Sequence, residues 1–286
     1  MYSLSSLEKK DFPPALLEIP EPPTTLRFAG KLPDWERPFL CVVGSRQYTS
    51  YGKEACEYII SGLRGSNVVI ISGLALGIDA VAHEAALKSG LTTIALPGSG
   101  LLPQMLYPKT NVALAKRILD AGGALLSEFP DKTQAAPYTF PQRNRLMAGL
   151  SRGVLVIEAQ ERSGTVITAR LATEYNKDVF AVPASIFSKN AEAPHRLIKA
   201  GAIPATCAED ILLQWGLMEE GARSRKEIPN ECNKEERILL ALLETPLPKE
   251  ELYERSGMNV TTVNVLLSSL EIKGLISESG GEVHRI

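Results

Sequence analysis

Residues 39–73 read FLCVVGSRQYTSYGKEACEYIISGLRGSNVVIISG and show most clearly the pattern on which the fold is built. Its two ends, 39–44 and 67–73, are short and almost wholly apolar, as buried strands are, while 51–65 has the mixed apolar and polar spacing of a helix. Two strands joined by a helix lie parallel in one sheet. The stretch therefore predicts an α/β protein with a parallel sheet.

The same alternation continues along the chain. Further strands are predicted at 92–98, 123–128, 153–159 and 178–184, and the helices between strands at 77–90, 111–123, 144–151 and 166–176. Strands that are apolar throughout are typical of sheets with helices on both faces. We therefore predict a Rossmann-like, doubly wound and mostly parallel sheet over residues 38–217. The proline-bearing residues 1–37 predict a lead-in segment with little regular structure.

Composition limits the class of protein. The hydrophobic fraction is 44% and the charged fraction 22%, which is ordinary for a soluble globular chain. No apolar run approaches the roughly 20 residues that span a bilayer, and the N-terminus lacks the pattern of a secretion signal. The four cysteines are scattered and form no CxxC pair. We therefore predict a reduced cytoplasmic protein without a membrane span, disulfide framework or metal site.

Charge is distributed unevenly along the chain. Residues 40–214 hold 17 Lys and Arg against 14 Asp and Glu, a net charge of +3, whereas residues 233–286 hold 6 against 9, a net charge of −3. Neither net charge is large enough to indicate a strongly basic face. Any anion site must therefore be local, made by a few placed groups.

Glycine and hydroxyl residues follow most of the predicted strands. They occur in GSR (44–46), SGLALG (72–77), PGSG (97–100) and AQERSGT (159–165). Small residues let a backbone approach a ligand closely, and free amides at helix starts favour anions, so these loops predict a phosphate cradle. Any one of these loops, taken alone, is equally well explained as a tight turn that binds no ligand. No GxGxxG or GxxxxGK[ST] pattern is present, so no nucleotide cofactor is predicted.

Asp79 and His83 lie four residues apart and share one helix face. They could form an acid–base or metal pair. The alternative is an aspartate in the first helical turn, where the helix dipole favours it, with a histidine partner. We favour the alternative because no third metal ligand is apparent.

The segment FPQRNRLMAG, residues 140–149, places Arg143 and Arg145 directly ahead of an apolar stretch. Two cations so close to a predicted core segment are either solvated surface charges or groups that hold an anion. Arg46, which follows the strand at 39–44, leaves the same two interpretations open.

Several segments together resemble the DNA-processing protein A family, also called DprA or Smf. They are VVGSRQYTSYGK, ISGLALGIDAVAHEAAL, GSGLLPQMLYPKTN, LLSEFP, FPQRNRLMAGLS, VIEAQERSGTVITARLA and LIKAGA, and the resemblance covers roughly residues 12–205. It implies an extended Rossmann fold that binds single-stranded DNA, forms a homodimer and loads RecA recombinase during natural transformation, without catalysis or a cofactor.

The resemblance also implies roles for residues. Arg143 and Arg145 would contact phosphates or hold the shape of a positively charged pocket, which Arg46 would join. Asn144 would hydrogen-bond a base edge or the DNA backbone, and Phe140 would stack on a base unless it is a core aromatic. The candidate DNA-binding residues are Gly44, Ser45, Arg46, Ser72, Gly73, Gly98, Lys109, Phe140, Arg143, Asn144, Arg145, Ser163, Gly164 and Thr165.

The C-terminal residues form a second predicted unit. A polar linker is expected over 218–232, followed over 233–286 by helices at 234–244, 248–257 and 259–274 and a hairpin at 275–286. This is the order of a winged helix and resembles the small C-terminal domain of many DprA proteins. Its would-be recognition helix exposes Thr261, Thr262, Asn264 and Ser268, with Lys273 at its far end. A protein contact or weak DNA contact is therefore favoured over strong duplex binding.

Two classes of function remain open on this sequence. The first is a non-enzymatic mediator of recombination that binds single-stranded DNA. The second is a Rossmann-type nucleotide phosphoribohydrolase, an enzyme class that uses a Gly-Thr phosphate loop followed by a catalytic glutamate. Here the loop has Gly164 and Thr165, but Glu174 lies nine residues beyond Thr165, which is misplaced for that chemistry.

Overall fold

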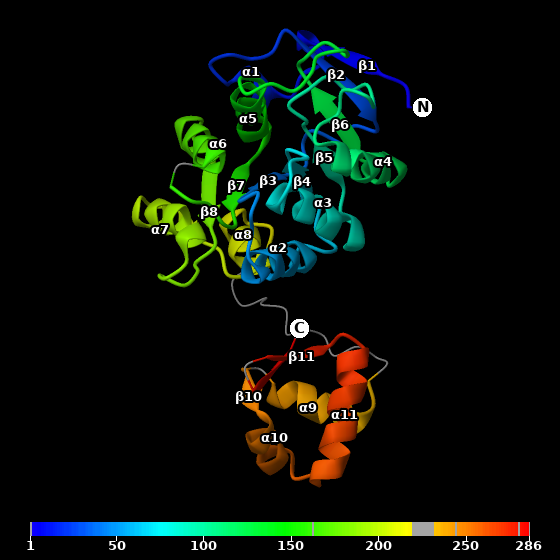
Figure 1. The fold of residues 1–286 in the computed structure, drawn as a ribbon, viewed down its shortest axis with the longest axis vertical. Coiled ribbons are helices and arrows are strands. Elements are labelled where there is room, and N and C mark those ends of the chain that lie inside the picture. The colour runs from blue at the N-terminus through cyan, green and yellow to red at the C-terminus, as the bar shows by residue number, and fades with distance from the viewer. Residues whose placement is uncertain (1, 162, 219–231, 244, 280, 286) are drawn as a thin grey trace. The chain divides into compact units, whose positions relative to one another are not determined.

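The computed structural model describes residues 2–161, 163–218, 232–243, 245–279 and 281–285 (Figure 1). The chain forms two compact units, Met1–Gly221 and Ala222–Ile286. The domain limits expected at residues 217 and 233 stay predictions, and nearly all of the linker expected over 218–232 lies outside the described residues. Among the described residues, no helix is both long and apolar enough to cross a membrane.

The first unit is built on one sheet. Within the described residues its nine strands follow the order β1-β2-β6-β5-β4-β3-β7-β8-β9. All neighbours from β6 to β9 run parallel, while β1 and β2 pair antiparallel with each other and β2 pairs antiparallel with β6. The strands are β1 Ser5–Glu8, β2 Thr25–Gly30, β3 Phe39–Val43, β4 Val69–Ser72, β5 Thr93–Ala95, β6 Ala124–Ser127, β7 Gly153–Val156, β8 Asp178–Ala181 and β9 Ile203–Pro204.

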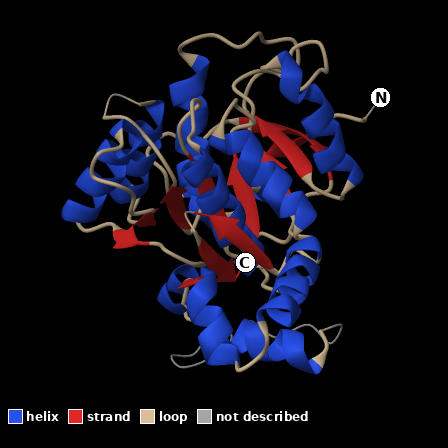
Figure 2. Ribbon diagram, turned by 60° about the horizontal axis from the view of Figure 1, so that its bottom comes forward, coloured by secondary structure: helices blue, strands red, loops and turns tan. Residues whose placement is uncertain are grey.

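Helices cover both faces of this sheet (Figure 2). One face carries α2 (Ser50–Gly62), α3 (Ile78–Lys88), α4 (Val112–Asp120) and α8 (Ala208–Gln214). The other carries α1 (Pro14–Leu17), α5 (Thr139–Leu150), α6 (Gly164–Glu174) and α7 (Glu192–Lys199). The predicted doubly wound fold with a mostly parallel sheet is therefore confirmed.

Strand β3 shows why its sequence is apolar throughout. Phe39, Cys41 and Val43 pack into the core on the α5 and α6 side, whereas Leu40 and Val42 pack into the core on the α2 and α3 side. Successive side chains of a strand point to opposite faces, and here both faces are covered. A polar residue at any of these five positions would be buried without a partner.

The expectation of little regular structure in residues 1–37 was wrong. Strand β2 extends the sheet beside β6, in a register that pairs Arg27 with Ser127 and Gly30 with Ala124. Leu26 is fully buried in the same core as Leu16 of α1. The segment gains its structure from an existing sheet edge, because a strand added there satisfies its backbone groups through β6.

The second unit has the elements of a winged helix. Its helices are α9 (Lys234–Leu242), α10 (Lys249–Ser256) and α11 (Val260–Ile272). Among the described residues three strands, β10 (Leu247–Pro248), β11 (Ile276–Ser279) and β12 (Glu282–Arg285), form an antiparallel sheet in the order β10-β12-β11. The core between them is rich in leucine and includes Leu239, Leu252, Val263 and Leu270.

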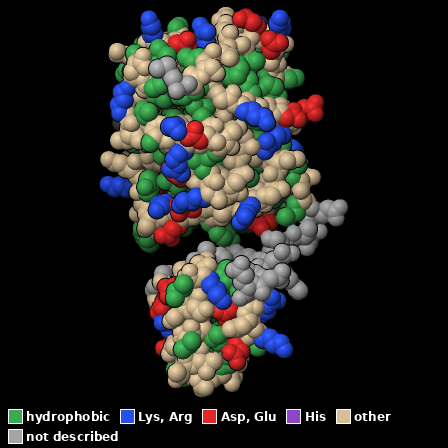
Figure 3. Space-filling model, turned by 90° about the vertical axis from the view of Figure 1, so that its right-hand side faces the viewer, with side chains coloured by type: hydrophobic (Ala, Val, Ile, Leu, Met, Phe, Trp, Pro, Cys, Tyr) green, Lys and Arg blue, Asp and Glu red, His purple; other side chains and the backbone are tan. Residues whose placement is uncertain are grey.

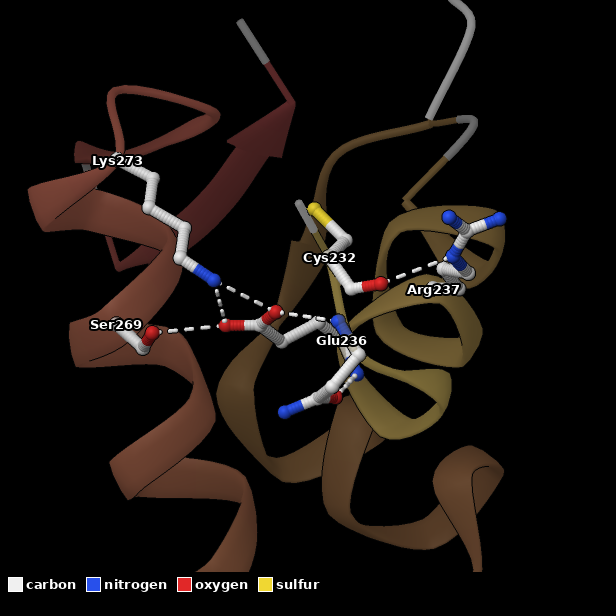
Figure 4. Close-up of polar contacts among 6 residues, drawn as sticks. Cys232, Glu236, Arg237, Ser269 and Lys273 are labelled. Atoms are coloured by element: carbon white, nitrogen blue, oxygen red, sulfur yellow. Dashed lines mark hydrogen bonds and ion pairs between the residues drawn. The ribbon is translucent and has the colours of Figure 1, made fainter. Parts of the chain in front are cut away.

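A buried carboxylate joins the first and third helices of this unit (Figure 4). Glu236 is only 1% exposed, and its carboxylate accepts hydrogen bonds from Lys273 Nζ at 2.7 and 2.8 Å and from Ser269 Oγ at 2.7 Å. It also completes a capping box with Asn233 at the start of α9. The Lys273 contact, with these other donors, lowers the pKa of Glu236 to about 2.

This cluster predicts how the second unit responds to acid. Because the folded-state pKa of Glu236 is about 2 and its ordinary value is 4.5, its contribution to stability is complete above pH 4.5 and is lost as the pH falls toward 2. At neutral pH, Lys273→Ala should destabilise the unit by about 1–3 kcal/mol, because it leaves a buried carboxylate without its cation.

The measurement is urea unfolding of the full chain, followed through the amide NMR signals of α9 and α11. The matched control is Lys249→Ala, which breaks the more exposed pair of Lys249 with Glu278 and should cost at most about 0.5 kcal/mol. An equal effect of the two substitutions would contradict a special role for the buried pair.

Candidate nucleic-acid interface

The candidate site lies where the direction of the strand order reverses. From β3 the chain continues through β4, β5 and β6 on one side, then crosses to β7 and β8 on the other. Ligands of doubly wound sheets bind at such a switch point, beyond the carboxyl ends of the strands. A pocket of about 480 Å³ lies there, lined by Val43, Gly44, Ser45, Arg46, Gln47, Ala75, Asp79, Phe140, Arg143, Asn144, Met147, Gln160, Ser163, Gly164, Thr165 and Thr168.

Arg46 and Phe140 meet at this pocket. Arg46 is exposed in the loop after β3, and its guanidinium carbon lies 5.5 Å from the centre of the Phe140 ring. Phe140 is half-buried at the start of α5, and the ring of Tyr107 lies 6.2 Å from it. Among the described residues, no carboxylate lies within ion-pair distance of Arg46. A cation and an aromatic face are therefore both available to a ligand.

Arg143 has a different environment. It is 5% exposed, and its Nη1 donates to the carbonyl oxygen of Gly73 at 2.6 Å and to that of Leu96. Its Nε donates to Asn144 Oδ1 at 3.1 Å. The short helix expected to begin at residue 144 begins at Thr139, so Arg143 lies within α5. Its side chain holds the shape of the pocket wall by linking α5 to the residues after β4 and β5.

Asp79 is a buried carboxylate in the same wall. It lies in the first turn of α3, is 7% exposed, and its Oδ2 accepts hydrogen bonds from the amides of Gly73 at 3.1 Å and Ala75 at 3.4 Å. Burial raises the pKa of its carboxyl, and the charge of Arg143 is the largest effect opposing that rise. The first-turn placement of Asp79 is as expected.

His83 is not the partner of Asp79. Its Nδ1 lies 2.8 Å from Thr93 Oγ1, and burial lowers its pKa to about 3, so the ring is neutral. Within the described parts of the chain, no cluster of three or more His, Cys, Asp or Glu side chains could hold a metal ion.

The start of α6 forms the opposite wall. Ser163 caps the helix by accepting a hydrogen bond from the Thr165 amide at 3.2 Å. Thr165 Oγ1 donates to the carbonyl oxygen of Gly44 at 3.2 Å, which ties α6 to the end of β3. An added Cβ at Gly164 would meet nothing within 4 Å. The helix start therefore faces open space, where its free amides favour negative charge.

Three predicted residues lie behind the pocket and leave room for its side chains. Ser72 is fully buried and donates to the Val42 carbonyl at 2.7 Å. A Cβ at Gly73 would lie 2.1 Å from the Arg143 guanidinium, and one at Gly98 would lie 2.6 Å from the Phe140 ring. None of the three lines the pocket, so they could affect ligand binding only through the residues that do.

Lys109 and Arg145 also lie outside the pocket lining. Lys109 is exposed, and its Nζ donates to the carbonyl oxygen of Gln104. Arg145 forms an ion pair with Glu128 and donates to the carbonyl oxygen of Glu21. The side chains of Arg145 and Glu128 are 15% and 14% exposed, so this pair fastens α5 to the end of β6 and to the N-terminal segment.

Sequence reasoning missed other pocket residues. Gln47 and Gln160 follow the ends of β3 and β7, and Thr168 lies one turn into α6 beyond Thr165. Asp79 was considered only as half of a pair with His83. The signal for Gln47 and Gln160 was their position soon after predicted strands, because the carboxyl ends of parallel strands share one edge. Asp79 and Thr168 lie in the first turns of the helices that begin at that edge.

Charge at the site is local. On the face shown in Figure 3, Lys and Arg side chains of the larger unit are interspersed with Asp and Glu side chains. Of the described residues that line the pocket, Arg46, Arg143 and Asp79 are charged. Glu174, the misplaced acid of the phosphoribohydrolase alternative, lies at the far end of α6, pairs with Arg170 at 3.3 Å and does not line the pocket.

Two family models and several known proteins match this chain. A family model described as DNA recombination-mediator protein A matches residues 3–216, and a model described as DprA winged helix domain matches residues 224–282. Protein Smf of Escherichia coli is 38% identical over 292 residues, which cover 100% of this chain and 78% of that relative. DNA processing protein DprA of Streptococcus pneumoniae is 42% identical over 207 residues, 71% of each chain.

Solved structures give the same result. DNA processing protein A from Streptococcus pneumoniae superposes with a TM-score of 0.70 at 40% identity, over 74% of each chain. The protein from Helicobacter pylori, described by its single-stranded DNA binding mode, superposes with a TM-score of 0.67 at 29% identity. That match covers 76% of this chain and 97% of the other.

Arg143, expected just ahead of a helix beginning at residue 144, is instead buried within α5. Arg143→Ala should lower the free energy of unfolding by about 3–5 kcal/mol, because it leaves Asp79 as an uncompensated buried charge. Arg46→Ala removes an exposed side chain and should change it by at most about 0.5 kcal/mol. Urea unfolding followed by far-UV circular dichroism measures both, and similar values would show that the two arginines share one environment.

Arg145→Ala should also destabilise the first unit, by about 1–3 kcal/mol, because Glu128 then stays largely buried without its cation. The control is Lys116→Ala, which breaks an exposed ion pair with Asp120 and should cost at most about 0.5 kcal/mol. The measurement is the thermal melting temperature of each of the two variants. A melt of the Arg145 variant that matches the control would show that its ion pair contributes no more than a surface pair.

Proposed function

Since the chain belongs to the DNA recombination-mediator protein A family, we propose that its pocket binds single-stranded DNA. The observation that carries the proposal is the exposed guanidinium of Arg46 against the ring of Phe140, at the carboxyl edge of the sheet. Arginine attracts phosphates, and an aromatic face stacks on bases that are not already stacked in a duplex. The start of α6 across the pocket offers further amides for a phosphate.

The preference for a single strand has two supports. A pocket of about 480 Å³ suits one unpaired nucleotide better than a duplex, and no single strongly basic face lines up with a duplex backbone. The Helicobacter pylori relative, whose description names single-stranded DNA binding, aligns over 76% of this chain at 29% identity. Of the predicted contacts, Gly44, Ser45, Arg46, Phe140 and Asn144 line this pocket together with Ser163, Gly164, Thr165 and the buried Arg143.

We further propose that the chain acts by binding and not by catalysis. In this proposal it protects an incoming strand in the cytoplasm as a homodimer and delivers it to RecA recombinase during natural transformation. The description recombination-mediator of the matched family supports this role.

The winged helix has a separate part in the proposal, as a contact for protein or a weak contact for DNA. Its α11 exposes Thr261, Asn264 and Ser268, with Val265 64% exposed beside them. Lys273 was the cation expected at the far end of this helix, but it is engaged with Glu236. Base readers are typically Arg, Lys, Asn or Gln, so this surface offers little for sequence reading.

The test is a titration of single-stranded and duplex oligonucleotides at several salt concentrations. The full chain should prefer the single strand. The log–log slope against salt should be only about one to two, because each neutralised phosphate on a single strand contributes about 0.7 and each pocket holds one.

The matched variant is Arg46→Ala, which should weaken binding by about tenfold, while Lys116→Ala, which removes a cation remote from the pocket, should not. Tighter binding to the duplex, or no binding to the single strand at low salt, would refute the proposed function. Equal effects of the two variants would refute the pocket as its site.

A further inference from the structure

The pocket contains a carboxylate where an anion site would be expected to have none. Of the described lining residues, Arg46 and Arg143 are positive and Asp79 is negative, so these side chains together carry one net positive charge. The proposed ligand carries a negative charge on every phosphate. The presence of Asp79 in the lining therefore needs a physical reason.

The side chain of Asp79 cannot move away from the pocket without losing its hydrogen bonds. Its Oδ2 is fixed by the amides of Gly73 and Ala75, and its side chain begins in the first turn of α3. The backbone before it is also constrained, because Gly77 has a φ of 86° and an added Cβ there would lie 2.2 Å from the Ser45 carbonyl oxygen. Oδ1 of Asp79 makes no hydrogen bond with the described residues, so it is the atom that remains for a ligand to meet.

Asp79 also neutralises Arg143. The two groups are buried in the same wall, where burial raises the pKa of Asp79 and lowers the pKa of Arg143. Each group is the largest charge that opposes this shift in the other. Of the described groups, those left for a ligand are Arg46 and the amides at the start of α6, which add a partial positive charge of about one half. Together they supply about one and a half positive charges, which suffice for one phosphodiester and fall short of a fully ionised monoester with two negative charges.

We propose that Asp79 restricts the pocket to phosphodiesters, which carry one negative charge, and rejects the terminal phosphate monoester at the end of a strand. The inference rests on the proposed function and deepens it. A monoester carries a charge of about −1.5 to −2 near neutral pH, and in a partly buried pocket the excess charge interacts with a carboxylate far more strongly than in water. The chain then engages DNA along its length and ignores whether an end is phosphorylated.

The experiment compares two short oligothymidylates of equal length, one with a 5′ hydroxyl and one with a 5′ phosphate. Both are short enough that an end must lie in or beside the pocket. Their affinities for the full chain are measured by competition against a fluorescent oligonucleotide at about pH 8, where the terminal phosphate carries close to two negative charges. The ratio of the two affinities is the readout, because it cancels any general change in binding.

For the wild-type chain the 5′ phosphate should give no gain in affinity. Asp79→Asn keeps an oxygen acceptor for the Gly73 and Ala75 amides but removes the charge, so it should bind the phosphorylated oligonucleotide about tenfold more tightly than the hydroxyl form. Asp120→Asn is the matched control. It makes the same change in net charge at an exposed site on α4 and should keep the wild-type ratio.

Asp79→Ser, a smaller neutral substitution, is measured beside Asp79→Asn, and circular dichroism melts show which variant is folded. If the folded variant keeps the wild-type ratio while hydroxyl-ended DNA still binds, the assignment of Asp79 is overturned and the proposed function stands. A wild-type chain that already prefers the phosphorylated end overturns the assignment as well. If the wild-type chain binds neither oligonucleotide, the proposed function itself fails.

Discussion

The buried guanidinium of Arg143 is the interaction on which the rest of the pocket depends. It supplies donors to the carbonyl oxygens of Gly73 and Leu96, which follow β4 and β5, and it balances the charge of Asp79. Taking one ion out of water costs several kcal/mol even after relaxation, so the loss of either charge should destabilise the first unit. Gly73 belongs to the same unit, because the guanidinium occupies the space where a Cβ would lie.

This arrangement separates the three arginines near the site into different roles. Arg143 and Arg145 come from the same helix, but each is used inside the protein, the first on backbone carbonyls and the second on Glu128. Arg46 comes from the loop after β3 and remains exposed against Phe140. Internal partners hold α5 in place, and that placement keeps the Phe140 ring beneath the one of the three guanidiniums that a ligand can reach.

Much of the fold followed from the sequence because its signals are local. The six parallel strands β3 to β8 were predicted from continuous apolar runs, which two-sided burial requires. Strands β1 and β2 were missed because they form only by pairing with a sheet edge that lies far along the chain. Nothing within the segment itself signals that edge.

The location of the site could be predicted from the sequence, but the hydrogen-bond and ion-pair partners of its side chains could not. Loops after parallel strands share one edge, so Gly44, Arg46 and Thr165 could be placed together in advance. The burial of Arg143 could not, because its acceptors lie 70 and 47 positions away in the chain. The contact of Lys273 could not be predicted for the same reason, because its partner Glu236 is 37 positions away in the chain. Lys273 was expected to be a surface cation and is instead part of a cluster around a buried carboxylate.

A pocket with so little net charge also limits how a long strand can be held. One phosphate neutralised at each pocket contributes modestly to affinity, and residues 233–286, with their net charge of −3, add no general attraction for a polyanion. In the proposed homodimer two pockets would meet one strand, and the second contact would form at the high effective concentration set by the first. Binding would then be strong along a strand and weak at any single point. A mediator that must yield the strand to a recombinase needs that combination, because each contact can be released in turn without opposing the whole affinity at once.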